Sequence, residues 1–318
     1  MILPNWFPSL MEMDVLTLYA VFTLALLLVT FAVLLFMQKI MGKNVASLWN
    51  IVRGWLIMLP LVFVVMLLGR VFIILGVSLL SLYGFREFAR ATGLSAHRSI
   101  NGIVYLGILA VAVSALMRDQ RTGELGAYGF FMALPTFVVG LILIVPVLQN
   151  RYKGQLQPVA LGIMGFVYFG WMFGHLSFLA NSTHADNYLL YLVFAVELND
   201  VTAFNFGRLF GRHKLRDQIS PNKTVEGALG ALGVSLCLPW LLSFSLPLFS
   251  PLQLILSGLI VGIGGQLGDL TISFIKRDVG IKDMGTSIPG HGGLLDRIDS
   301  LVFVASLFFH MTRYFRLL

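Results

Sequence analysis

The segment VLTLYAVFTLALLLVTFAVLLFM, residues 15–37, contains 23 consecutive residues and no charged side chain. A helix of about 20 apolar residues is long enough to cross the hydrocarbon core of a bilayer. Inside lipid, a segment must pair its own backbone N–H and C=O groups, and an α-helix does this without a partner. Residues 15–37 therefore predict a transmembrane helix.

Similar apolar segments recur along the chain, at residues 54–68, 71–85, 100–117, 128–148, 156–180, 188–210, 225–247, 253–275 and 298–313. Of the 318 residues, 58% are hydrophobic and only 12% are charged, whereas about 25% are charged in an average soluble domain. We therefore expect an all-α, polytopic integral membrane helical bundle with about 8–10 transmembrane helices. Segments 54–68 and 71–85 are separated only by Gly69 and Arg70. They predict either a tight helical hairpin or one long tilted helix.

The basic residues are distributed unevenly over the predicted loops. With the N-terminus outside, 17 of the 22 Lys and Arg residues fall on the cytoplasmic side and 5 fall outside. Such a bias is the usual orientation signal of a membrane protein. The formal net charge of +7 thus indicates a basic cytoplasmic face and no nucleic-acid partner. The single cysteine, Cys237, excludes a disulfide within the chain.

Acidic residues gather near the C-terminus. Five of the fifteen lie within 31 residues, namely Asp269, Asp278, Asp283, Asp296 and Asp299. Asp269 lies inside an apolar segment, and acids in such places are costly and usually functional. Asp296 and Asp299 are three residues apart and share one helix face. Carboxylates that converge in this way suit a hard divalent cation such as Mg²⁺. The alternative is a charge-balanced loop, in which these acids pair with nearby Lys and Arg residues.

A glycine-rich stretch, residues 288–293 (IPGHGG), lies between these acids. Glycines allow backbone N–H groups to approach an anion closely, as in phosphate-binding nests. Four cations surround the stretch, namely Lys276, Arg277, Lys282 and Arg297. Phosphate bound together with Mg²⁺ is the chemistry that this combination favours. A simple turn between two helices is the alternative.

A second polar cluster lies upstream. Glu197, Asn199 and Asp200 interrupt an apolar segment, and Asp200 inside the membrane predicts a functional role. The segment ISPNKTVEG, residues 219–227, follows. Ser220 and Thr224 could line a site, or they could simply cap the helix that begins near residue 224.

The stretch SFIKRDVGIKDMGTSIPGHGGLLDRID, residues 273–299, resembles the signature of the phosphatidate cytidylyltransferase (CDP-diacylglycerol synthase) family. About a dozen fixed positions agree, so the motif is highly specific. The resemblance extends upstream to Asp200, to Gly207 and Gly211, to residues 220–227 and to Asp269. It divides the chain into a lipid-embedded scaffold, residues 1–195, and a catalytic transmembrane region, residues 196–318.

The resemblance implies a membrane-embedded helical fold, commonly dimeric, with a polar funnel near the cytoplasmic face of the bacterial inner membrane. The implied reaction converts CTP and phosphatidic acid into CDP-diacylglycerol and pyrophosphate. It would require Mg²⁺, with a monovalent cation such as K⁺ as a second ion. The implied partners are thus CTP, phosphatidic acid in the bilayer and a second copy of the chain.

The resemblance also implies roles for individual residues. Catalytic roles are implied for Asp269, Lys276, Asp296 and Asp299. The three aspartates of that set, Asp269, Asp296 and Asp299, would bind the metal. Substrate binding is implied for Asp200, Ser220, Lys223, Thr224, Ser273, Arg277, Lys282, His291, Gly292, Gly293 and Arg297.

The chain departs from the family pattern around Asp200. The family usually has small residues on both sides of this acid and a tyrosine after it, whereas this chain has Leu198, Asn199, Val201 and Phe204. These changes indicate a divergent paralogue, so a cytidylyltransferase that acts on a different lipid phosphate is an alternative. A cation-coupled membrane transporter is an alternative of another class, because buried acids and broken helices also occur there.

Overall fold

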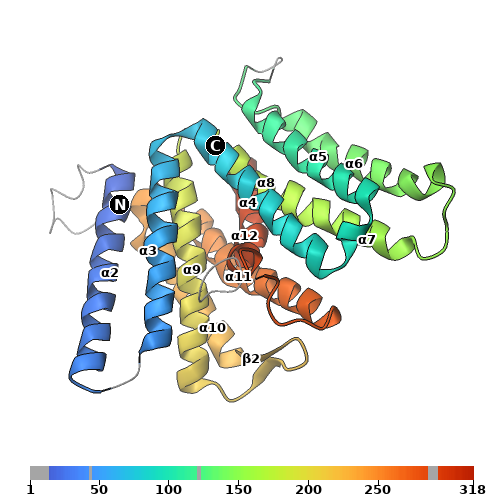
Figure 1. The fold of residues 1–318 in the computed structure, drawn as a ribbon. Coiled ribbons are helices and arrows are strands. Elements are labelled where there is room, and N and C mark those ends of the chain that lie inside the picture. The colour runs from blue at the N-terminus through green and yellow to red at the C-terminus, as the bar shows by residue number, and fades with distance from the viewer. Residues whose placement is uncertain (1–13, 43–44, 120–122, 286–292) are drawn as a thin grey trace.

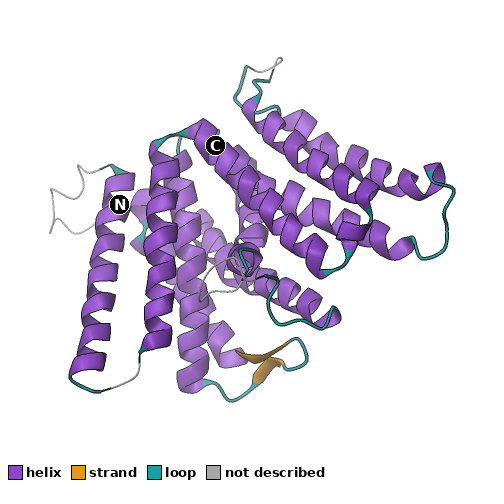
Figure 2. Ribbon diagram, in the orientation of Figure 1, coloured by secondary structure: helices purple, strands orange, loops and turns teal. Residues whose placement is uncertain are grey.

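The computed structural model describes residues 14–42, 45–119, 123–285 and 293–318, apart from the side chains of residues 47, 48, 50 and 51. The described chain is almost entirely helical, with one small hairpin (Figure 2). Its helices are α2 (Val15–Lys39), α3 (Ala46–Leu67), α4 (Arg70–Ala91), α5 (Arg98–Leu116), α6 (Tyr128–Leu148), α7 (Leu156–Gly165), α8 (Phe173–Leu179), α9 (Ala185–Phe210), α10 (Val225–Leu241), α11 (Pro251–Asp278) and α12 (Leu295–Tyr314). Further helical elements are the short turns at Leu94–Ala96 and Ser243–Ser245 and a π-helical segment, Phe166–Met172.

The predicted all-α membrane bundle is confirmed. Among the described residues, 7 helices are long and apolar enough to cross a membrane, with α7 and α8 counted as one. Two shorter apolar helices, Val52–Leu67 and Val225–Leu241, add to them. Each of the ten predicted segments coincides with a helix or a helical run, although α12 is too polar to belong to either group. The protein is therefore a membrane protein.

The structure defines the helix boundaries within two predicted regions, residues 54–85 and residues 156–180. Residues 54–85 form two helices, because the chain breaks at Gly69 with a φ of 83°, a left-handed conformation that favours glycine. Residues 156–179 form one run in which a π-helical segment, Phe166–Met172, separates α7 from α8. Such π segments are rare and often occur at functional sites.

The helices form an elongated assembly (Figure 1). α2 packs against α3 and α9 at one side, whereas α5, α6 and α7 form the opposite side. α4, α8 and α12 lie between these groups, and α10 and α11 pack beside α9 and α12. The predicted boundary between residues 195 and 196 falls inside α9, and one hydrophobic core runs through both parts.

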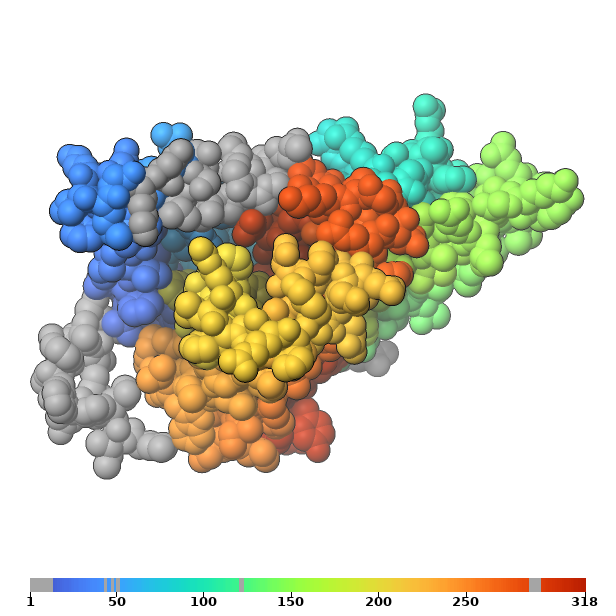
Figure 3. All heavy atoms as spheres, turned by 90° about the horizontal axis from the view of Figure 1, so that it is seen from below, coloured from blue at the N-terminus to red at the C-terminus, as the bar shows by residue number. Residues whose placement is uncertain are grey.

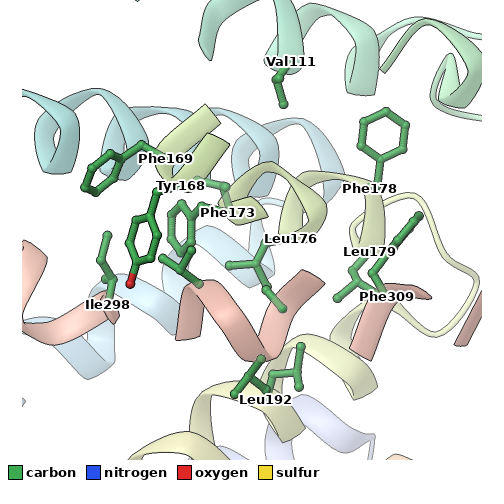
Figure 4. Close-up of a cluster of buried hydrophobic side chains, with 14 of the residues drawn as sticks. Val111, Tyr168, Phe169, Phe173, Leu176, Phe178, Leu179, Leu192, Ile298 and Phe309 are labelled. Carbon is green, nitrogen blue, oxygen red and sulfur yellow. The ribbon is translucent and has the colours of Figure 1, made fainter. Parts of the chain in front are cut away.

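The core where the two parts meet is rich in aromatic rings (Figure 4). Phe169, Phe173 and Phe178 come from the run that contains the π segment, and Ile298 and Phe309 come from α12. All of these side chains are buried. Rings of this size dominate the stability of a packed core, so α12 is held firmly against the N-terminal part. This packing matters because α12 carries two of the predicted catalytic aspartates.

Candidate functional site

Four elements bring the predicted site residues together. α9 carries Asp200, the strand before α10 carries Lys223, α11 carries Asp269, and α12 carries Asp299. Gly268 allows the close approach of α11 and α12, since a Cβ atom there would collide with the backbone of Asp299 and Ser300. A residue with a side chain at this position would push the two helices apart.

Asp200, Asp269 and Asp299 form the carboxylate cluster of this site. They come from three helices, and each repels the charge of at least one other member. Asp299 is only 5% exposed, and its carboxylate accepts a hydrogen bond of 2.7 Å from the backbone N–H of Ser300. The hydroxyl of Ser300 donates to Asp200 over 3.0 Å. The cluster thus concentrates negative charge in a partly buried place, where repulsion is weakly screened.

Lys223 partly balances this charge. Its Nζ atom lies 2.7 Å from Oδ2 of Asp269, and it also donates to Oε1 of Gln266 over 3.2 Å. The other oxygen of Asp269 accepts a hydrogen bond of 3.1 Å from Ser273, one turn further along α11. The predicted residues Lys223, Asp269 and Ser273 are therefore direct neighbours. Among the described residues, no Lys or Arg lies within ion-pair distance of Asp200 or Asp299.

Lys276 and Asp296 form a second pair. The Nζ atom of Lys276 lies 2.8 Å from Oδ1 of Asp296, and the two side chains are only 13% and 9% exposed. Oδ2 of Asp296 accepts hydrogen bonds from the backbone N–H groups of Met284 and Gly293, over 3.1 Å and 3.0 Å. The carboxylate of Asp296 therefore binds the segment that joins α11 to α12 at two positions, Met284 and Gly293. The structure places it with Lys276, whereas Asp269 and Asp299 lie with Asp200.

The hairpin between α9 and α10 was not predicted as strands. β1 (Lys214–Arg216) pairs antiparallel with β2 (Ser220–Thr224), with Arg216 opposite Ser220. Thr224 is the N-cap of α10, because its hydroxyl accepts a hydrogen bond of 3.1 Å from the N–H of Gly227. The cap expected near residue 224 is therefore present, whereas Ser220 lies in the strand.

The end of α11 lies next to this hairpin, on the face that Figure 3 shows. Nε of the Arg277 side chain donates to the carbonyl of Ile219 over 3.3 Å. Arg277 itself is exposed, and so is Lys282. Arg297, on α12, attracts the charge of Glu197. The four predicted cations thus lie at different depths: the Lys276 side chain is largely buried, whereas Arg277 and Lys282 are exposed.

Two predicted substrate-binding residues, His291 and Gly292, lie outside the described residues, as does most of the predicted phosphate nest at 288–293. Gly293 is described and buried, and its N–H donates a hydrogen bond to Asp296.

The structure also shows where the residues that depart from the family pattern near Asp200 lie. Asn199 is buried and accepts a hydrogen bond of 3.1 Å from Ser235 on α10, whereas Phe204 is 67% exposed. The change to Phe204 therefore alters the outer surface of α9.

The donor set can be compared with the needs of a metal ion. Among the described residues, no three Asp, Glu, His or Cys side chains are placed as a complete metal site. Mg²⁺, however, commonly uses one or two protein carboxylates and completes its shell with waters and substrate phosphates. Asp269 and Asp299 offer such carboxylates beside Asp200, in a place with surplus negative charge. The residues therefore fit a Mg²⁺ ion that would take the rest of its shell from water and phosphate oxygens.

Several residues that shape the site have no signal in the motif. Tyr168, in the π segment, donates a hydrogen bond of 2.9 Å to the backbone carbonyl of Asp299. Glu87, on α4, accepts one of 2.9 Å from the N–H of Leu295, at the start of α12. Both come from the predicted scaffold. Neither residue stood out in the sequence, because Glu87 lies just beyond the predicted apolar segment 71–85, between Arg86 and Arg90.

Comparison with known proteins identifies the family of the chain. A model of the cytidylyltransferase family matches residues 49–315. The chain belongs to the cytidylyltransferase family. A phosphatidate cytidylyltransferase of Staphylococcus haemolyticus is 35% identical over 256 residues, which are 79% of this chain and 92% of the relative. One of Staphylococcus epidermidis is 34% identical over 253 residues, with the same coverage of 79% and 92%. An uncharacterised protein of Escherichia coli, YnbB, is 44% identical over 126 residues, or 40% of this chain and 42% of the relative.

Proposed function

We propose that this protein is a phosphatidate cytidylyltransferase, which forms CDP-diacylglycerol and pyrophosphate from CTP and phosphatidic acid. The observation that carries the proposal is the alignment with the Staphylococcus haemolyticus enzyme, which spans 92% of that relative. The geometry agrees with it, because buried carboxylates and lysines from distant segments meet at one place in the bundle. Two polyanionic substrates require such a mixture of cations and metal-binding acids.

The chemistry follows from the substrates. An oxygen of the phosphatidate headgroup attacks the α-phosphorus of CTP, a new P–O bond forms, and the bond to the β-phosphate oxygen breaks to release pyrophosphate. The attacking oxygen is already an anion, so no side chain has to remove a proton from it. The main obstacle is the repulsion between two anions, and positioning with opposite charge overcomes it.

Individual residues can divide this work. Lys223 and Lys276 each stand beside a carboxylate, so each can offer a cation to a phosphate group. Arg277, which is exposed, and Arg297, which is partly exposed, add positive charge nearer the protein surface. Asp269 and Asp299 would hold Mg²⁺, which supplies charge neutralisation to the phosphates when it is bound. Asp296, the third carboxylate that the family resemblance assigns to the metal, holds Lys276 and the adjoining backbone in this structure.

The orientation and assembly are further parts of the proposal. The active end would face the cytoplasm, where CTP is available, and the positive loops support this orientation. The bacterial relatives suggest the inner membrane. We also propose a homodimer, which light scattering of the detergent-solubilised protein would test. A monomeric mass with full activity would contradict the dimer and leave the reaction unchanged.

The substrate assignment can be tested with purified protein in detergent micelles. Pyrophosphate release should require CTP, Mg²⁺ and phosphatidate together, and it should be absent with CTP alone. Parallel reactions with other lipid phosphates examine whether the unusual residues around Asp200 change the lipid. Release that depends on another lipid phosphate, and not on phosphatidate, would overturn the substrate and keep the reaction class.

A further inference from the structure

Glu87 lies at the meeting point of the scaffold and the site. It belongs to α4, far from the signature in sequence, and it is only 6% exposed. One oxygen of its carboxylate, Oε2, accepts a hydrogen bond of 2.9 Å from the backbone N–H of Leu295. Leu295 is the first residue of α12 and directly precedes Asp296. A carboxylate from a distant helix therefore contacts the start of the helix that carries Asp296 and Asp299.

The start of α12 needs such an acceptor. The first N–H groups of any helix have no partner within the helix, and an N-cap side chain usually satisfies one of them. Leu294 occupies the N-cap position of α12, and a leucine side chain has no acceptor atom. Glu87 supplies the missing oxygen from outside, and its negative charge suits the positive end of the helix dipole.

The backbone around Glu87 is shaped to receive this carboxylate. A Cβ atom at Gly285 would collide with the Glu87 side chain, which supplies the three nearest atoms. A Cβ atom at Gly293 would collide with the Oε2 atom of Glu87. Glycine at both positions therefore lets the chain close in on the carboxylate. Gly285 lies near the middle of the segment between α11 and α12, and Gly293 lies close to the start of α12. Glu87 is therefore next to this segment at two separate positions, and it binds α12 at its first residue.

We propose that Glu87 is a positioning residue, which caps α12 from α4 and thereby fixes the aspartates of α12 relative to those of α9 and α11. We assign it a positioning role because it holds α12 through a backbone N–H group, that of Leu295. The inference rests on the proposed function for its kinetic readout. It adds that the scaffold takes part in setting the geometry of the site, and that the scaffold does more than embed the protein in lipid.

The first test compares Glu87→Ala and Glu87→Gln with the control Glu124→Gln, an exposed acid in the loop between α5 and α6. We expect Glu87→Ala to lower kcat about tenfold or more, with less than a threefold change in the CTP concentration at half-saturation. Glu87→Gln keeps an acceptor oxygen, so it should retain more activity than Glu87→Ala. The control should match the unsubstituted protein. Full kcat in both Glu87 variants would overturn the proposal.

The second test is a double-mutant cycle between Glu87 and Gly285, which also separates this inference from the proposed function. Gly285→Ala alone should lower the thermal unfolding temperature, because the new methyl group meets the Glu87 side chain. In the Glu87→Ala background, the same change should lower it much less. Strictly additive effects would overturn the contact. This readout needs no substrate, so it stands even if the unsubstituted protein forms no CDP-lipid, an outcome that would contradict only the proposed function.

Discussion

At the residue scale, the aspartates of the site have two kinds of neighbour. Asp299 and Asp200 lie among other acids, and no Lys or Arg of the described chain is within ion-pair distance of them. Asp296 is instead held by Lys276 and by two backbone N–H groups. Removing the charge should therefore have opposite effects on folding at Asp299 and at Asp296, although both changes should reduce activity.

The variants Asp299→Asn and Asp296→Asn should differ in their thermal unfolding temperatures. Asp299→Asn removes one of several repelling charges, so CDP-lipid formation should be lost while the thermal unfolding temperature stays equal or rises. Asp296→Asn leaves Lys276 as a buried cation without its counter-charge, and breaking such a pair costs roughly 3–5 kcal/mol. Its unfolding temperature should fall. The measurements are thermal unfolding in detergent and conversion of labelled CTP. An unfolding temperature that falls for Asp299→Asn and not for Asp296→Asn would contradict this account.

Much of the site could be predicted at this scale, because the acids and cations of residues 273–299 stand out in an apolar chain. The charge-balanced alternative expected acids paired with nearby cations, and Lys276 with Asp296 is such a pair. Which acid takes which partner could not be predicted. Spacing groups Asp296 with Asp299, yet Asp296 pairs with Lys276 on another helix. Ser300 reaches Asp200 across 100 positions, and Leu295 reaches Glu87 across 208. The buried histidine His175 likewise meets His310 at 3.1 Å. Contacts of this kind depend on how the helices pack against one another, and a local sequence pattern does not predict that packing.

At the element scale, the close contact of α11 with α12 decides where Asp299 lies. A side chain at Gly268 would meet the backbone of Asp299 and Ser300, and backbone cannot move aside as a flexible side chain can. Gly268→Ala should therefore destabilise the protein by about 1–3 kcal/mol and reduce CDP-lipid formation.

A matched control is available in α10, where a Cβ atom at Gly233 would have open space around it. Gly233→Ala should leave activity unchanged and should stabilise the helix slightly, because alanine has the higher helix propensity. Both variants are compared by thermal unfolding and by product formation. Equal behaviour of the two variants would mean that the approach of α11 to α12 is not tight at Gly268.

The N-terminus of α10 offers another element-scale prediction. Thr224 caps this helix through its hydroxyl, and loss of an N-cap costs about 1 kcal/mol. Thr224→Ala should lower the unfolding temperature by a few degrees, and Thr224→Ser should restore it. If Thr224 also lines the substrate site, the alanine variant will need more CTP for half-saturation. An unfolding temperature unchanged in Thr224→Ala would show that the cap contributes nothing.

The helices themselves were predictable, because each needs a long apolar run and the chain has few polar interruptions. The exceptions have physical reasons. The hairpin β1–β2 is short and polar, with no alternating apolar pattern to indicate strands. The π segment inside residues 156–179 leaves apolar periodicity nearly unchanged. The helix that was expected to end at residue 247 ends at Leu241, shortly after Pro239, which weakens helical pairing.

At the scale of the whole molecule, the orientation in the membrane is the main prediction. The hairpin β1–β2 and the C-terminal end of α2 lie at one end of the bundle (Figure 1). The loop that contains Glu124 belongs to the side predicted to be outside. Cys237 is the only cysteine, so a Cys237→Ser background allows single cysteines to be introduced at chosen ends.

In that background, Glu124→Cys should react with a membrane-impermeant maleimide applied to intact spheroplasts. Asn222→Cys, at an exposed position in β2, should react only after the membrane has been permeabilised. Labelling is measured by the mass of the purified protein. The reverse pattern would invert the orientation and would place the proposed site on the side without CTP.

We propose that residues from both parts of this bundle build a Mg²⁺-dependent cytidylyltransferase. The most direct measurement incubates the purified protein with labelled CTP, phosphatidate and Mg²⁺, and identifies the lipid product by mass spectrometry. We predict CDP-diacylglycerol in the reaction, its loss on chelation of Mg²⁺ with recovery when Mg²⁺ is restored, and its absence from a folded Asp299→Asn variant. A correctly folded, unsubstituted protein that forms no CDP-lipid from phosphatidate or any other lipid phosphate would contradict the account.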